Sequence, residues 1–122
     1  MDIEPRPLSD VELAVANLLL SGQFDGVGPL RQQVAGAKVV GRCDCGCPTI
    51  YLLPDPSAPS APVAGPLAPA ELRVMPVGEG PPGEVLLFIE AGRVASLEYV
   101  FYDDGTPPSR WPDLDRMTVV PR

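Results

Sequence analysis

The chain has 122 residues, of which 45% are hydrophobic and 20% are charged, so it is long enough for one modest core and too short for two. Its net charge of -7 argues against binding to nucleic-acid phosphates, which requires clustered cations. Histidine is absent, which excludes histidine-based catalytic triads and histidine-rich zinc sites.

Two helices are predicted near the N-terminus. The first begins in LSDVEL, where Ser9 at the N-cap is followed three residues later by Glu12, the spacing of a capping box. Its predicted buried face consists of apolar residues at helical spacing: Val11, Ala14, Val15 and Leu18. A shorter helix is predicted from Pro29 to Ala35, since proline is favoured at the first helical position.

The rest of the chain is typical of strands. Segments rich in β-branched and aromatic residues predict strands at 37–42, 49–53, 71–77, 85–90 and 93–102, with a short final strand at 117–121. The segments 85–90 and 93–102 flank Ala91-Gly92, which indicates a tight hairpin. In 93–102 the odd-numbered residues form the more apolar face, expected to pack on the helices: Ala95, Leu97, Tyr99 and Phe101.

This order predicts a single α+β domain over 1–122, with one or two N-terminal helices packed on a mostly antiparallel sheet of about five strands. Prolines recur at 54, 56, 59, 62, 66 and 69. Residues 54–69 are therefore predicted to form an extended, polyproline-like surface loop. Such a loop could bind an aromatic groove of another protein, but a connector between strands is the interpretation we favour.

The stretch GRCDCGCPTI places Cys43, Cys45 and Cys47 at every second position. In a straight strand such side chains lie about 6–7 Å apart, too far for three sulfurs to share one ion. The chain must therefore curl for the thiols to meet. Gly46 permits this curl and Asp44 favours a turn, so the stretch is predicted to form the tip or bulge of a hairpin with clustered thiols.

Three interpretations of the cysteines remain open. Each could be a small buried apolar residue, which we favour. Together they could hold zinc or copper(I), with Asp44, a water or a partner as a fourth ligand, although structural zinc sites almost always supply four ligands themselves. Alternatively, two thiols could form a strained disulfide that the third resolves.

The C-terminal half combines aromatic and acidic residues. A surface for a basic partner protein is predicted from these residues: Glu98, Tyr102, Asp103, Asp104, Trp111, Asp113 and Asp115. Two simpler interpretations compete with it: Trp111 could cover a sheet edge, and the carboxylates could be a solvated rim, as charge clusters usually are. No nucleophile–base pair or glycine-rich phosphate loop is recognisable, so no catalytic residues are assigned.

The chain resembles a family of small, functionally uncharacterised proteins, mostly from high-GC actinobacteria. Four stretches carry the resemblance: LSDVELAVANLLLSGQFDG, LRQQVAGAKVVGRCDCGCPTI, LEYVFYDD and the following WPD. The C-x-C-G-C-P core is the most specific of them, and the family usually has glycine where this chain has Asp44. The C-terminal half is also similar to immunity and accessory proteins of bacterial toxin systems, which implies a role in binding another protein.

We therefore expect a non-enzymatic, acidic protein-binding module of immunity or accessory type, with a metal-binding or thiol redox-sensing protein as the alternative. The protein is expected in the cytoplasm, because three closely spaced cysteines do not suit an ordinary disulfide framework. The acidic, proline-broken N-terminus is not typical of a signal peptide. No nucleic-acid or membrane partner is expected.

Overall fold

A computed structural model describes residues 1–76, 82–102 and 108–122. The helices are α1 (Asp10–Leu19) and α2 (Val27–Ala35), with a 3-10 helix, η1, at Leu114–Arg116. The strands are β1 (Asp2–Pro7), β2 (Lys38–Arg42), β3 (Ile50–Leu53), β4 (Leu67–Val74), β5 (Gly83–Glu90), β6 (Arg93–Phe101) and β7 (Met117–Pro121).

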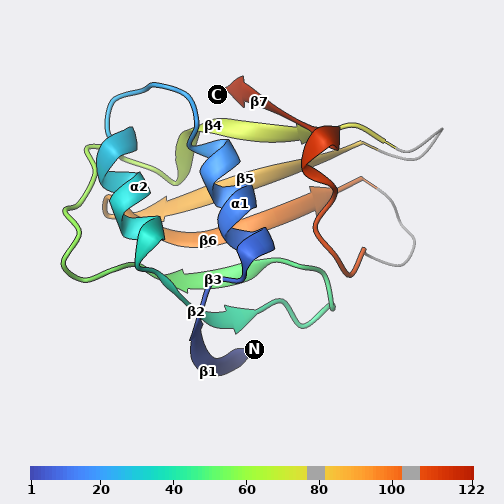
Figure 1. The fold of residues 1–122 in the computed structure, drawn as a ribbon, viewed down its shortest axis with the longest axis horizontal. Helices are drawn as coiled ribbons and strands as arrows, with labels where there is room; N and C mark the ends of the chain where they lie inside the picture. Colours follow the sequence, from blue (N-terminus) through green and yellow to red (C-terminus); the bar gives the residue numbers. More distant parts are fainter. Residues whose placement is uncertain (77–81, 103–107) are drawn as a thin grey trace.

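The described strands form one seven-stranded sheet in the order β1-β2-β3-β6-β5-β4-β7, and every neighbouring pair is antiparallel. Both helices lie on the same face of this sheet (Figure 1). The core between the two layers is built from fully buried aliphatic side chains, including Leu19, Leu30, Leu72, Leu87 and Leu97. The α+β prediction is confirmed, and the short final strand predicted at 117–121 is present as β7. The sheet has seven strands rather than about five, and β1 is the strand that was not predicted.

Helix α1 begins as predicted but buries a different face. The Glu12 N–H donates to Ser9 Oγ at 3.2 Å, and Glu12 Oε1 accepts from the Ser9 N–H at 2.8 Å, which completes the capping box. The buried residues are Glu12, Val15, Ala16 and Leu19, whereas Val11 is exposed. The predicted face was therefore wrong by about one residue: Val15 is buried as expected, but Val11 is exposed and the ion-paired Glu12 is buried instead.

A β-bulge changes which residues of β6 face the core. Phe88 pairs with Ser96 but Ile89 pairs with Val94, so Ala95 is an extra residue on β6. Val94 and Leu97 are buried in the core and Tyr99 packs against it, whereas Ala95 lies outside the core cluster. The predicted odd-numbered face is correct after the bulge, and Val94 replaces Ala95 before it. The hairpin at Ala91-Gly92 is confirmed, and both residues have positive φ.

The proline-rich segment is held against the domain. Ala61 and Val63 are buried in the core cluster, and the Ala61 N–H donates to the Gly92 carbonyl at 2.8 Å. The Arg93 guanidinium donates to the carbonyls of Asp55 and Ala58. The predicted loop over 54–69 ends early, because β4 begins at Leu67. The loop is thus an anchored connector rather than a fully exposed one.

The last residue of the strand predicted at 71–77 lies outside the described residues, and β4 ends at Val74. The strand predicted at 85–90 begins two residues earlier, at Gly83. Within the described ranges, no helix is long and apolar enough to cross a membrane.

Candidate functional site

The three cysteines lie in the loop that connects β2 to β3. The Cys43 N–H donates to the Thr49 carbonyl at 3.3 Å, and the Gly46 N–H donates back to the Cys43 carbonyl at 3.4 Å. Gly46 has a φ of 88°, a left-handed conformation that a side chain would disfavour. The predicted curl at the tip of a hairpin is confirmed, and glycine at position 46 makes it possible.

This curl gathers the sulfur atoms into a thiol cluster, defined as Cys43, Cys45 and Cys47. All three Sγ atoms lie within 4.8 Å of one another, and those of Cys43 and Cys45 are 2.9 Å apart. Three sulfurs bound to one ion at about 2.3 Å would lie about 4 Å apart, so small side-chain rotations would bring the cluster to that geometry. The thiols are free, with no disulfide between them.

The burial of the cysteines differs from one to the next. Cys47 is buried, Cys43 is half-buried and Cys45 is exposed. Packing as a small apolar residue therefore describes Cys47, but it gives no reason for the exposed Cys45. The cluster is accessible from solvent on one side and fixed to the domain on the other.

Hydrogen bonds within the cluster separate the acidities of its thiols. The thiol of Cys45 shares hydrogen bonds with Cys43 and Cys47, which raises the pKa of Cys45 to about 11. Burial alone would raise the pKa of Cys47, but hydrogen bonds from Cys45 and from the side chain and backbone of Thr49 outweigh it and lower that pKa. Cys47 is thus better suited than Cys45 to carry the first thiolate, which is the form that binds metals.

Asp44, considered as a fourth ligand, points elsewhere. Its Oδ1 atom lies 3.1 Å from the amino-terminal nitrogen of Met1, and its side chain is 81% exposed. Across the described ranges, the group of residues close enough to share an ion contains the three cysteines alone.

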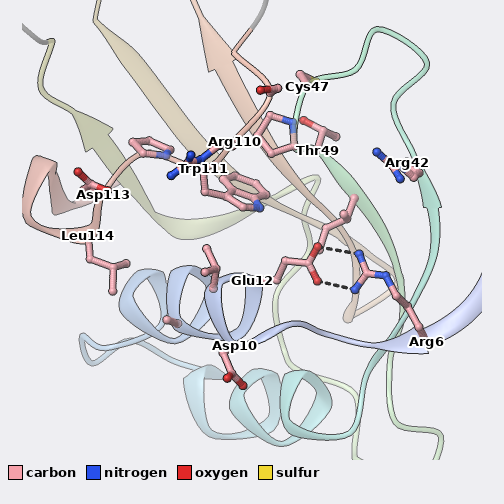
Figure 2. A pocket seen from close by; sticks show the side chains of 16 residues that line it. Arg6, Asp10, Glu12, Arg42, Cys47, Thr49, Arg110, Trp111, Asp113 and Leu114 are labelled. Atoms are coloured by element: carbon pink, nitrogen blue, oxygen red, sulfur yellow. Dashed lines mark hydrogen bonds and ion pairs between the residues drawn. The ribbon is translucent and has the colours of Figure 1, made fainter.

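A cavity of about 590 Å³, called here the Trp111 pocket, adjoins the thiol cluster (Figure 2). Its walls come from Arg6 in β1, the first turns of α1, Arg42 at the end of β2, residues 47–50 and residues 109–114. Cys47 belongs to this wall. Sequence patterns did not indicate this pocket, because periodicity reports on single elements and these five segments meet only in the folded chain.

Trp111 lies over the sheet rather than at its edge. Its ring stacks on Tyr99 of the central strand β6, with ring centroids 6.2 Å apart and an angle of 14° between the planes. It remains half-buried and packs against the core. The interpretation of Trp111 as a cover for a sheet edge was therefore wrong, and its free surface faces the Trp111 pocket.

The other predicted partner-binding residues are spread over the molecule. Asp113 lines the Trp111 pocket, and Asp115 is exposed in η1. Glu98 precedes Tyr99 in β6, so it points to the opposite face of the sheet, where it accepts a hydrogen bond from Ser96 Oγ at 2.8 Å. Tyr102 is exposed just beyond β6, and Asp103 and Asp104 lie outside the described residues.

Comparison with known proteins gives no further assignment: no protein-family model, curated protein or solved structure matches the chain.

Proposed function

We propose that the thiol cluster binds one soft metal ion and that Cu(I) is the ion it prefers. The observation that supports this proposal is the convergence of three Sγ atoms within 4.8 Å, at the exposed tip of a hairpin. Thiolates are soft ligands that select Cu(I) and zinc over harder cations such as magnesium or calcium.

The number of donors favours Cu(I) over zinc. Structural zinc is almost always bound by four ligands, and catalytic zinc keeps three protein ligands with an exchangeable fourth position. Within the part of the chain that the structure covers, the cluster supplies three sulfurs, and Asp44 is directed toward Met1. Three thiolates can surround Cu(I) without a fourth donor, whereas zinc would need a water or a ligand from a partner.

The different exposure of the cysteines suits reversible binding of a metal ion. Cys45 can meet an incoming ion because it is exposed, whereas Cys47 is held by the fold. Each thiol loses its proton when it binds the ion, so binding releases protons and weakens as the pH falls. A protein of this kind would carry or sense the metal rather than catalyse a reaction on it.

Replacing Cys45 with serine is expected to weaken Cu(I) binding by about 100-fold or more, since one of three ligands is lost. The measurement is a competition titration of the reduced protein against a chromophoric Cu(I) chelator, without oxygen, with a parallel zinc titration. Asp44→Asn is the matched control, because it changes a neighbouring side chain in the same loop and should leave the affinity within about threefold.

One Cu(I) per chain, lost in Cys45→Ser and kept in Asp44→Asn, would support the proposal. Equal Cu(I) affinity in the wild-type protein and in Cys45→Ser would overturn the proposal that the thiol cluster binds the ion. Tighter binding of zinc than of Cu(I) would overturn the preference for Cu(I). If the thiols bind neither ion, the redox and packing interpretations remain.

The protein-binding function predicted from the sequence remains a second proposal. It is supported by the net charge of -7 and by the exposed positions of Tyr102 and Asp115. The immunity or accessory role depends on the resemblance alone. Mixing the purified protein with the products of neighbouring genes tests it, and the absence of any stable complex at low and moderate salt would count against it.

A further inference from the structure

We infer that the Trp111 pocket binds a small organic anion, with the apolar part of the ligand against Trp111 and its carboxylate at Arg42. This inference is independent of metal binding by the thiol cluster. The volume of the pocket, about 590 Å³, lies in the range of about 300–1,000 Å³ that is usual for small-molecule sites.

Two large apolar side chains that line the pocket are exposed to solvent. Val11 and Leu114 both line it, and they are 55% and 45% exposed, although large aliphatic side chains gain free energy when they are covered. The half-buried indole of Trp111 lines the same pocket and is stacked on Tyr99 of the sheet. Exposed apolar groups around a concave surface are typical of a site that covers them with a ligand.

The charged residues decide the sign of the ligand. Arg6 is already neutralised, because its two terminal nitrogens donate to both carboxylate oxygens of Glu12, at 2.7 and 2.8 Å. Arg42 makes no ion pair with a carboxylate among the residues described. Figure 2 shows Arg42 on the same side of Trp111 as Arg6, where it lines the pocket with an exposed side chain.

Apart from Glu12, which is paired with Arg6, the acidic residues of the pocket lie away from this cationic end. Figure 2 shows the Asp10 carboxylate directed away from Trp111, beyond α1. Asp113 lies on the other side of Trp111 from Arg42, near Arg110 and Leu114. A carboxylate at Arg42 would therefore meet a cation without facing an unpaired carboxylate of the pocket lining, and the guanidinium could bind it through two parallel hydrogen bonds. A cationic ligand would lack a partner at this end.

The inference is tested with three ligands that share one ring: 2-naphthoate, 2-naphthalenemethanol and 2-naphthylmethylamine. Isothermal titration calorimetry measures the affinity of each, and amide chemical shifts locate the binding site. We expect naphthoate to bind about tenfold more tightly than the alcohol, and the amine most weakly. Arg42→Gln should weaken naphthoate binding about tenfold and leave the alcohol unchanged, while Leu114→Ser should weaken all three.

Arg73→Gln is the matched control, because it makes the same substitution at an exposed position of β4, outside the Trp111 pocket. Naphthoate binding no tighter than the amine, or an equal effect of Arg42→Gln and Arg73→Gln, would overturn the inference. The titration is repeated on Cys45→Ser, in which naphthoate binding should be unchanged. Unchanged naphthoate binding by Cys45→Ser would support the inference about the Trp111 pocket even if the thiol cluster bound no metal.

Discussion

Replacing Gln33 with alanine is expected to lower the free energy of unfolding by about 3–4 kcal/mol, a large share of the stability of a domain of this size. Gln33 is completely buried in α2. Its Nε2 donates to the carbonyls of Pro59 and Gly92, and its Oε1 accepts from the Val94 N–H at 2.8 Å. One side chain thus connects the helix, the proline-rich loop and the β5–β6 hairpin, and alanine leaves a cavity and buried polar groups without partners.

Urea-induced unfolding followed by circular dichroism measures this effect. Gln32→Ala is the matched control, because it changes the same residue type one position earlier, where the side chain is exposed, and it should cost less than about 0.5 kcal/mol. Gln33→Leu nearly preserves the volume and removes the hydrogen bonds, so it should still cost about 2–3 kcal/mol. Similar stabilities of Gln33→Ala and Gln32→Ala would show that these hydrogen bonds do not hold the three elements together.

Glu12→Gln is expected to lower the free energy of unfolding at neutral pH by about 1–2 kcal/mol. It should also make the free energy of unfolding depend less on pH in the acidic range. Burial alone would raise the pKa of Glu12, but hydrogen bonds from Arg6 and Ser9 and the charge of Arg6 outweigh it and lower that pKa. The stabilisation is therefore present above the unfolded pKa of about 4.3, and it is lost as the pH falls through the lower folded pKa. Because Arg6 is partly exposed, solvent reduces the effect of the pair.

The check is a series of unfolding measurements from about pH 7 to pH 2.5 on the wild-type protein and the variant. The two stabilities should converge at the acidic end, because the wild-type Glu12 is then protonated. Asp10→Asn serves as the control, since it removes an exposed carboxylate from the same helical turn. A constant difference at every pH would mean that the charge of Glu12 contributes nothing, and that only its shape matters.

Local chemistry made several elements predictable. The Ser9–Glu12 spacing gave the start of α1, and Ala91-Gly92 gave the turn of the β5–β6 hairpin. Gly46 marked the curl that gathers the cysteines. Each of these signals lies within a few residues, so no distant part of the chain is needed to interpret it.

The features that were missed depend on distant partners. Strand β1 was not expected, because Pro5 and Pro7 are unfavourable in strands and its pairing with β2 spans more than thirty residues. The burial of Glu12 depends on Arg6, which lies on that same strand. For the Trp111 pocket, Trp111 and Asp113 had been selected for their residue types, whereas Arg42 gave no local signal. Val11 had been assigned to the core by helical spacing, and it joins the pocket through the fold.

The outermost strands of the sheet both contain proline. Pro5 and Pro7 lie in β1, and Pro121 ends β7. Another molecule lengthens a sheet by pairing with the free backbone N–H and C=O groups along an edge strand, and proline has no N–H to offer. The β1 border, with two prolines, is therefore a poor template for growth, whereas Pro121 removes a donor only at the last residue of the β7 border.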